Sequence, residues 1–309
     1  MRTYDAVVVG GGPAGMTAAL YLLRSGIQTL MVEKLSPGGQ VLLTEEIENY
    51  PGFPEGLKGY ELADAFAAQL ERYHPDKILD EVREMKLDPE GSDGHELLVG
   101  DEWIKAKSLI LCSGARYRKL GVPGEQRLLG RGVSYCALCD GNFYRGKTVA
   151  VIGGGNSALE ESLYLAKLVK KLYLIHRRED FRGLKCYQDK CFTHEAIKVV
   201  RSTVVHEILG ESEVTGVVME NVATGERSTL DVDGVFVFVG FDPNVGFVPD
   251  LVQMDRNGII TDTEMRTNVP GVFAAGDVRS KHCRQVATAV GDGATAANSA
   301  FAYLEQMHA

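Results

Sequence analysis

The sequence predicts an α/β fold built around two copies of a βαβ unit. Two observations lead to this prediction. A pattern of apolar strand, glycine-rich turn, amphipathic helix and second apolar strand occurs twice, and the two occurrences coincide when the sequence is shifted by 143 residues. A length of 309 residues allows about two domains, each with its own buried core. We therefore expect one βαβ unit in each of two domains.

The first unit begins close to the N-terminus. Residues 6–15 read AVVVGGGPAG, a helical pattern follows, and residues 29–33 read TLMVE. Gly10 allows a tight turn out of the strand, Gly12 lets a pyrophosphate approach the helix N-terminus, and Gly15 keeps the helix close to the sheet. The candidate binding residues of this turn are Gly10, Gly12, Pro13, Ala14 and Gly15.

The second unit repeats the arrangement. Residues 149–158 read VAVIGGGNSA, and residues 172–176 read LYLIH. A single Gly-x-Gly-x-x-Gly is a weak indication, whereas two copies in strand–turn–helix context are typical of Rossmann-like dinucleotide-binding domains. The candidate binding residues of this turn are Gly153, Gly155, Asn156, Ser157 and Ala158.

The two units differ at the end of the second strand, where nucleotide specificity is set. Glu33 in the first unit suits the ribose hydroxyls of the adenosine half of FAD. The second unit has His176 there, followed by Arg177, Arg178 and Arg182. Because guanidinium groups bind a 2′-phosphate that an acidic residue would repel, this pattern favours NADPH over NADH. Alternation along the strand favours Arg177 and Arg182 as ligands, and the alternative is a solvated, charged strand end.

Composition excludes several other classes of function. A formal net charge of -9 argues against general binding to nucleic acid or to an anionic membrane. No apolar stretch is long enough to span a bilayer. The apolar run near the N-terminus is broken by glycines and by Pro13, and no convincing cleavage site follows it. We expect a cytoplasmic protein.

One pair among the six cysteines is close in sequence, Cys136 and Cys139. Cysteines three residues apart lie on one side of a helical turn, close enough to open and close a disulfide. In a reductase, one thiol accepts electrons from a flavin and the other attacks a substrate disulfide as a thiolate. The neighbouring Asp140 could move the accompanying protons.

A zinc site is the alternative use of this pair, with Cys186 and Cys191 as its second half. Five residues of separation place those two side chains roughly 140° apart on a helix, at about 100° per residue, which is a poor geometry for chelation or for a disulfide. We therefore expect no metal site. Cys112 ends an apolar strand, so core packing is its expected role.

With these features in place, the chain resembles the low-molecular-weight thioredoxin reductases of bacteria and archaea over nearly its whole length. The dithiol precedes the second glycine turn, whereas larger disulfide reductases carry it in the first unit and add a C-terminal dimerisation domain. Further segments that carry the resemblance are PGGQ at 37–40, ENYPGFP at 48–54, CSGA at 112–115, HRR at 176–178, and GVFAAGD at 271–277 with Arg284-Gln285 after it.

The resemblance implies a path for electrons from NADPH through FAD and the Cys136–Cys139 disulfide to thioredoxin or a thioredoxin-like protein. Cys139 would face the flavin, Cys136 would attack thioredoxin, and Asp140 would act as acid and base. Asp277 would hold the ribityl chain of the flavin. The FAD-binding positions that the resemblance adds are Gly39, Gln40, Asn49, Gly114, Gly276, Asp277, Arg284 and Gln285.

The resemblance also implies a domain organisation. Residues 1–117 and 245–309 would form a discontinuous FAD-binding domain, and residues 118–244 would form an inserted NADPH-binding domain that carries the Cys-x-x-Cys. A homodimer built through the FAD domains is expected from the family alone. The sequence departs from the family pattern at Leu138, where threonine is usual, and at Cys283, where tyrosine is usual.

Three other functions remain open from the sequence. Related flavoproteins oxidise dithiols with oxygen or take electrons from ferredoxin, but both would be expected to lose the NADPH features that are intact here. An NADPH-dependent reductase of a different small or protein disulfide would keep every feature. A redox sensor without rapid turnover would also keep both pockets, and a turnover measurement separates it from an enzyme.

Overall fold

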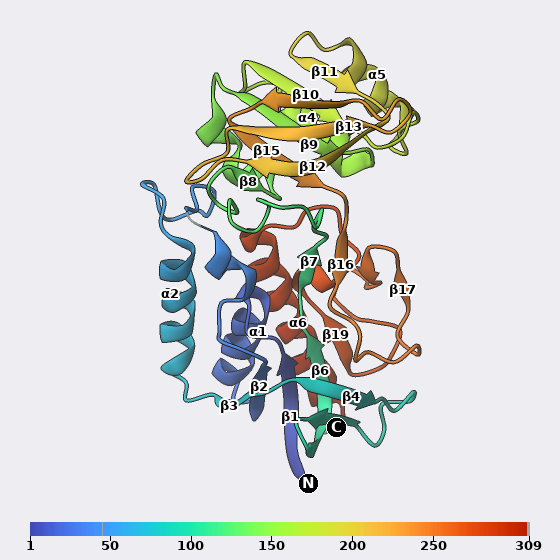
Figure 1. Cartoon of the computed structure of the whole chain (residues 1–309). Coiled ribbons are helices and arrows are strands. Elements are labelled where there is room, and N and C mark those ends of the chain that lie inside the picture. The colour runs from blue at the N-terminus through green and yellow to red at the C-terminus, as the bar shows by residue number, and fades with distance from the viewer. Residues whose placement is uncertain (45, 308–309) are drawn as a thin grey trace. The chain divides into compact units, whose positions relative to one another are not determined.

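The computed structural model describes residues 1–44 and 46–307, and the chain divides into two compact units (Figure 1). The first unit comprises Met1–Arg116 and Asp242–Ala309, and the second comprises Tyr117–Phe241. The unit boundaries fall in two short strands, β7 (Ala115–Tyr117) and β16 (Phe241–Pro243). They lie one and three residues from the domain limits expected from the sequence, 117 and 245.

A mostly parallel sheet organises the first unit. Its strand order is β3-β2-β1-β6-β5-β4, and β19 also pairs with β6. Strand β1 is parallel to both β2 and β6, whereas β4, β5 and β6 are antiparallel neighbours. The strands are β1 (Arg2–Val9), β2 (Thr29–Glu33), β3 (Asp76–Leu79), β4 (Val82–Lys86), β5 (His95–Val99), β6 (Glu102–Leu111) and β19 (Val272–Ala274).

Helices pack beside this sheet and bury its apolar side chains. Figure 1 shows α1 next to α6 and α2, and α1 contacts both of these helices. Residues 6–9 of β1 are all buried, as expected for a central parallel strand covered on both faces. The helices are α1 (Pro13–Arg24), α2 (Gly59–Glu71), α6 (Val286–Met307) and the 3₁₀ turns η1 (Gly39–Leu43) and η3 (Gly276–Val278); two short strands are β17 (Met254–Asp255) and β18 (Gly258–Ile259).

The second unit repeats the plan on a smaller scale. A parallel sheet has the order β11-β10-β9-β15-β8, and a separate antiparallel sheet has the order β12-β13-β14. The strands are β8 (Val133–Ser134), β9 (Thr148–Gly153), β10 (Lys171–Ile175), β11 (Ile197–Val200), β12 (Thr203–Leu209), β13 (Gly216–Asn221), β14 (Arg227–Asp231) and β15 (Gly234–Phe238). The helices are α3 (Ala137–Asp140), α4 (Asn156–Leu165), α5 (Lys185–Thr193) and the 3₁₀ turn η2 (Gly141–Tyr144).

The strand order reverses at the same point of each unit. Strand β1 lies between β2 and β6, and strand β9 lies between β10 and β15. In open parallel sheets, ligands bind at the carboxyl ends of the strands where the order reverses, which here is the glycine turn after β1 and after β9. The fold class expected from the two repeats, an α/β fold with two Rossmann-like domains, is confirmed.

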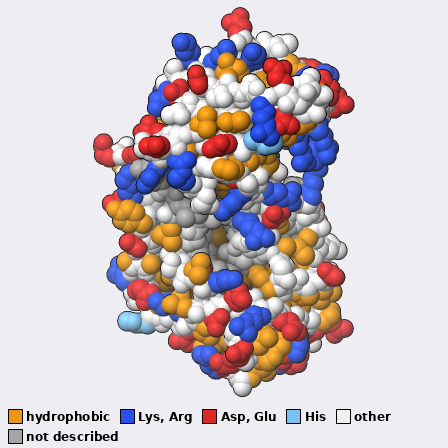
Figure 2. All heavy atoms as spheres, in the orientation of Figure 1, with side chains coloured by type: hydrophobic (Ala, Val, Ile, Leu, Met, Phe, Trp, Pro, Cys, Tyr) orange, Lys and Arg blue, Asp and Glu red, His pale blue; other side chains and the backbone are white. Residues whose placement is uncertain are grey.

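Within the described residues, no helix has the length and apolar character needed to cross a bilayer. Basic and acidic side chains are interspersed on the face of each unit seen in Figure 2, without one continuous basic field.

Candidate functional site: two dinucleotide turns and a redox disulfide

The first glycine turn opens onto a cavity of about 770 Å³ that lies wholly within the first unit. Its walls come from the ends of β1, β2 and β6, from the start of α1, and from the segment that joins β19 to α6. A Cβ atom built at Gly12 would meet nothing within 4 Å, so the N-terminus of α1 faces open space. The turn is therefore shaped to admit a bulky anionic group.

Most of the residues expected to bind FAD meet in this cavity. Gly15, Asn49 and Arg284 do not line it. Gly15 packs under the turn, where a Cβ would collide with the carbonyl oxygen of Gly10. The expected residues that line the cavity are Gly10, Gly12, Pro13, Ala14, Glu33, Gly39, Gln40, Gly114, Gly276, Asp277 and Gln285.

Asp277 is an unusual group in the cavity wall. Its Oδ1 is buried and has no hydrogen-bond partner among the described residues. Burial raises the pKa of its carboxyl, and the nearby charges of Lys281 and Arg284 partly oppose that rise. A buried acceptor left unpaired is costly, so a donor from a ligand, such as a sugar hydroxyl, fits this position.

Glu33 holds the first glycine turn through hydrogen bonds to the backbone. Its Oε2 accepts the N–H of Gly11 at 2.6 Å, and its Oε1 accepts the N–H of Leu35 at 2.9 Å. The carboxylate is therefore held at the tip of β2 and lines the cavity. This is the position from which an acidic side chain can accept hydrogen bonds from a ribose.

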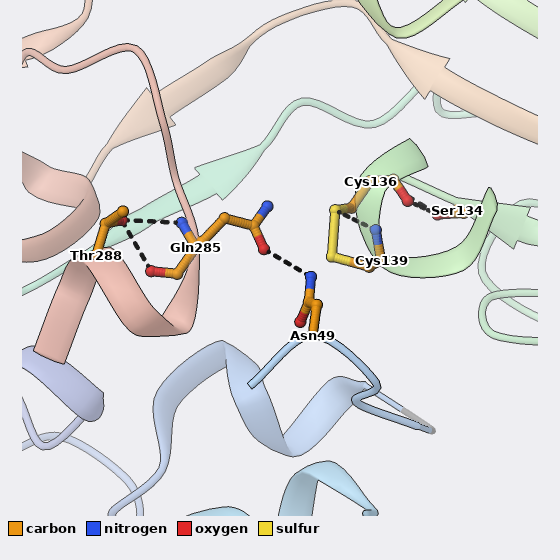
Figure 3. Close-up of a disulfide and its surroundings, with 6 residues drawn as sticks. All are labelled: Asn49, Ser134, Cys136, Cys139, Gln285 and Thr288. Carbon is orange, nitrogen blue, oxygen red and sulfur yellow. Dashed lines mark hydrogen bonds between the residues drawn. A yellow bond between two sulfur atoms is a disulfide. The ribbon is translucent and has the colours of Figure 1, made fainter. Parts of the chain in front are cut away.

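Two expected residues that are far apart in sequence are in contact beside the cavity. Asn49 Nδ2 donates to Gln285 Oε1 at 3.1 Å (Figure 3). Gln285 lies just before α6, where its backbone N–H donates to Thr288 Oγ1. Arg284 instead serves the backbone, because its guanidinium donates to the carbonyl oxygens of Lys281, Asn257 and Arg279.

The second glycine turn is built like the first. A Cβ atom at Gly155 would meet nothing within 4 Å, so the N-terminus of α4 is also open. Asn156 and Ser157 are exposed at the start of this helix, whereas Ala158 is buried against the sheet. Asn156 Oδ1 accepts the N–H of Leu184 at 2.8 Å, which ties the turn to the loop that follows β10.

His176 lies beneath that loop. Its side chain is buried, its ring lies 4.6 Å from that of Phe181, and its Nε2 donates to the carbonyl oxygen of Asp180 at 3.2 Å. The absence of a Cβ at Gly154 makes room for the imidazole. Burial lowers the pKa of His176, and the neighbouring arginines lower it further. A buried, neutral imidazole supports the loop, so direct contact between His176 and a 2′-phosphate stays a prediction.

The three arginines of this loop are presented to solvent. Arg177, Arg178 and Arg182 are all exposed, whereas alternation along a strand predicts opposite faces for the first two. The reason is that β10 ends at Ile175, so the alternation of a strand does not extend to them. The backbone N–H of Arg182 donates to the carbonyl oxygen of Gly154 at 2.8 Å, which holds the arginine loop against the glycine turn.

Cys136 and Cys139 form a disulfide in the second unit (Figure 3). Cys136 is the N-cap of α3, and the N–H of Cys139 donates to Cys136 Sγ at 3.1 Å. Ser134 holds the backbone that leads into the disulfide, because its Oγ accepts the N–H of Cys136 at 3.0 Å. A donor aimed at Cys136 Sγ favours the thiolate form of this sulfur after reduction.

The other cysteines are apart from this pair. Cys186 is exposed and Cys191 is buried on α5, and burial raises the pKa of Cys191 to about 11. Cys112 is buried in the core of the first unit, as the sequence predicted, and also lines its cavity. Across residues 1–44 and 46–307, no group of three or more His, Cys, Asp or Glu side chains is arranged to hold a metal ion.

Several residues of the cavity wall are not among the binding residues expected from the sequence. Ser113 and Asn244 line the cavity of the first unit and are joined across 131 residues, with Asn244 Nδ2 donating to the carbonyl oxygen of Ser113 at 2.8 Å. Asp80 and Glu81, at the end of β3, also line it. Only the pairing of β3 beside β2 brings these acidic residues near Glu33, so no local motif could indicate them.

Two dinucleotide-binding turns and a Cys-x-x-Cys disulfide together define a nucleotide-dependent disulfide oxidoreductase. The model of the pyridine nucleotide-disulphide oxidoreductase family matches residues 4–293. The chain is 42% identical to thioredoxin reductase from Listeria monocytogenes over 308 residues, which cover 99% of this chain and 95% of that protein. It is also 42% identical to thioredoxin reductase from Treponema pallidum, with 98% of each chain covered.

A solved structure gives the same result. The crystal structure of thioredoxin reductase from Streptococcus pyogenes superposes with a TM-score of 0.93 and 44% sequence identity over 99% of both chains. The chain therefore belongs to the pyridine nucleotide-disulphide oxidoreductases and, within them, to the thioredoxin reductases. It is an oxidoreductase whose cofactors are FAD and NADPH.

Proposed function

We propose that this enzyme uses electrons from NADPH to reduce the disulfide of thioredoxin or of a thioredoxin-like protein. The observation that carries the proposal is the Cys136–Cys139 disulfide, held at the N-terminus of α3 in the unit that also contains the second dinucleotide turn. The relatives that resemble the chain over almost its full length are named thioredoxin reductases.

The first unit provides the features that FAD requires. The pyrophosphate of FAD would lie at the open N-terminus of α1, and its adenosine ribose at Glu33. A hydroxyl of the ribityl chain would donate to the unpaired oxygen of Asp277. The cavity of about 770 Å³ is in the usual size range for a cofactor site. When bound, FAD would accept a pair of electrons from NADPH and make them available to a disulfide.

The second unit provides the features that NADPH requires. The open N-terminus of α4 suits its pyrophosphate, and the exposed guanidinium groups of Arg177, Arg178 and Arg182 suit its 2′-phosphate. His176 and Asn156 would support this site from beneath, since their side chains hold the loop that carries the arginines.

The two cysteines account for the transfer to a substrate disulfide. After reduction, the Cys136 thiolate would attack one substrate sulfur, forming a mixed disulfide and releasing the other substrate sulfur as a thiolate. The Cys139 thiolate would then attack Cys136 Sγ, which restores the Cys136–Cys139 disulfide and releases the second substrate thiol. Asp140 is placed one residue from Cys139 to supply and take up the protons of these steps.

Apolar side chains beside the disulfide suit a protein partner. Leu138 and Phe143 are 41% and 40% exposed, although both are large hydrophobic residues. Leu138 stands between the two cysteines, so a protein that presents a disulfide would cover it. A small-molecule disulfide would not need such a surface.

The proposal is tested by turnover under anaerobic conditions. The purified enzyme would be mixed with NADPH and oxidised thioredoxin, and NADPH consumption would be compared with that of NADH. Sustained, NADPH-specific turnover is expected. If NADPH bleached the flavin and thioredoxin drew no further electrons, the cofactor assignment would stand and another disulfide substrate would replace thioredoxin.

We also infer from the family that the enzyme is a cytoplasmic homodimer. Light scattering coupled to size-exclusion chromatography tests the oligomeric state, and a monomer at micromolar concentration would contradict it. Fractionation of the source cells tests the location.

A further inference from the structure

One carboxylate ties the segment between β19 and α6 to the helix that follows it. Asp292 lies two turns into α6, and its Oδ2 accepts the N–H of Gly276 at 3.1 Å and Lys281 Nζ at 2.7 Å. Its Oδ1 accepts Arg279 Nη1 at 2.9 Å. The side chains of Arg279, Lys281 and Asp292 are only 11–12% exposed. The Asp292 clamp, as we name these three contacts, therefore has three points of attachment along six residues of one loop.

The loop held by this clamp is the one that carries Asp277. Gly276 and Asp277 both line the cavity of the first unit, and Asp277 Oδ1 is the buried oxygen that has no partner among the described residues. Asp292 does not line that cavity. Asp292 binds Gly276 on one side of Asp277, and Arg279 and Lys281 on the other. It therefore fixes the direction of the Asp277 side chain without pairing with it.

The Asp292 clamp lies where the loop before α6 packs against both α1 and α6. Gly276 has a φ of 77°, and a Cβ atom there would come within 2.9 Å of Ala14 Cβ at the start of α1. Gly293, the residue after Asp292, packs so closely on α1 that a Cβ would collide with the carbonyl oxygen of Ala14. The glycine turn, the loop and α6 are thus locked together at one point.

Stability alone is a weak reason for this arrangement. Buried ion pairs recover little more than the cost of removing their charges from water, and apolar side chains of similar size often stabilise a core equally well. Here two cations share one carboxylate at a place that adjoins a ligand cavity. An arrangement of this kind is more typical of a site in which supporting residues orient the groups that contact the ligand.

We propose that Asp292 is a positioning residue for FAD, which acts through the Asp292 clamp by holding Gly276 and Asp277 in the orientation that the cofactor needs. This inference rests on the proposed assignment of the cavity to FAD. It adds a residue that does not line the cavity and that no binding motif contains.

The test is the release of FAD from the holoenzyme on dilution, followed by the rise in flavin fluorescence. For Asp292→Asn we expect the dissociation constant of FAD to rise about tenfold, the order of effect that follows loss of a charge-assisted contact. The visible absorption spectrum of the bound flavin should also change, because Asp277 is no longer fixed. Asp292→Glu keeps the carboxylate and should stay within about threefold of the parent enzyme.

Asp5→Asn is the matched control. It removes an ion pair of the same unit, Lys107 Nζ to Asp5 Oδ1 at 2.8 Å, from the middle of β1, outside the glycine turn. We expect FAD affinity and the flavin spectrum to be unchanged in this variant. Equal weakening by Asp5→Asn and Asp292→Asn would overturn the inference, since general loosening of the unit would then explain both.

A dissociation constant for Asp292→Asn within twofold of the parent, with an unchanged spectrum, would also overturn it. If Asp292→Asn fails to fold, Lys281→Gln serves instead, because it removes one attachment and keeps the Arg279 and Gly276 contacts. We expect it to weaken FAD binding about threefold, and no change would count against the clamp. Failure of the parent enzyme to bind FAD at all would contradict the proposed function rather than this inference alone.

Discussion

The hydroxyl of Tyr135 donates to Glu125 Oε1 at 2.7 Å, one residue before the redox-active Cys136. Glu125 is almost fully buried, and it also accepts the backbone N–H groups of Leu120 and Gly121 at 2.8 Å. Burial and the Glu125 carboxylate both raise the pKa of Tyr135, so its hydroxyl stays protonated and remains a donor. A buried carboxylate with three donors thus anchors the segment that leads into the disulfide.

Tyr135→Phe should therefore destabilise the second unit. Removing the hydroxyl leaves a buried carboxylate with one donor fewer, which we expect to cost about 2 kcal/mol of unfolding free energy. Chemical denaturation of the holoenzyme measures this loss. Tyr173→Phe is the control, because the Tyr173 hydroxyl has no hydrogen-bond partner in the described part of the chain. Equal losses in both variants would refute the role of Glu125.

Local sequence patterns were sufficient to predict the strands and glycine turns of the two βαβ units. The apolar run at 29–33 is β2, and the run at 172–176 is β10 shifted by one residue. These elements follow from short-range rules, since strand periodicity and glycine turns are set by neighbouring residues. The spacing of Cys136 and Cys139 likewise predicted a redox pair, and the structure contains that disulfide.

The supporting contacts could not be predicted, because each depends on residues brought together by the fold. Asp292 meets Gly276 only after α6 packs beside the loop, and Glu125 meets Tyr135 across a turn with no recognisable motif. The role of His176 could not be predicted from the sequence either. Its position in the sequence suggested a ligand, whereas its burial beneath Gly154 depends on the path of the loop after β10.

Arg182→Gln should weaken NADPH binding selectively. Loss of one guanidinium from the proposed 2′-phosphate site is expected to raise KM for NADPH about 10- to 100-fold and to leave KM for NADH nearly unchanged. Steady-state kinetics with both nucleotides measure this. Arg227→Gln removes an arginine of the same unit that pairs with Glu220 on the antiparallel sheet, and it should change neither constant. A parallel rise in both KM values for Arg182→Gln would contradict the 2′-phosphate assignment.

The first unit should lose stability as pH falls through the range of histidine. His95 is buried, its Nδ1 accepts the N–H of Asp88 and its Nε2 donates to the carbonyl oxygen of Pro270, so the ring is neutral. Burial lowers its pKa below the ordinary value of 6.5. The unfolded chain therefore binds the proton more readily, and stability present above about pH 6.5 is lost as pH falls toward the lowered pKa.

The loss from this one group is at most about 1.4 kcal/mol per pH unit. Denaturation curves between pH 7.5 and 5.5, a range chosen to lie above most carboxylate pKa values at roughly 4, measure it. His95→Gln should flatten the dependence, whereas His74→Asn, at an exposed position, should leave it intact. An unchanged slope in His95→Gln would show that other groups are responsible.

Cys139→Ser should separate the two halves of the reaction. The variant keeps both dinucleotide turns, so NADPH should still bleach the flavin at a rate close to that of the parent enzyme. It cannot close the Cys136–Cys139 disulfide, so thioredoxin turnover should fall at least about 1000-fold, as expected when a covalent step is removed. Cys186→Ser changes an exposed cysteine of the same unit and should keep full turnover. If Cys139→Ser still reduced thioredoxin at the parent rate, the electrons would have to reach thioredoxin without the disulfide, and the role proposed for Cys136 would fall with that of Cys139.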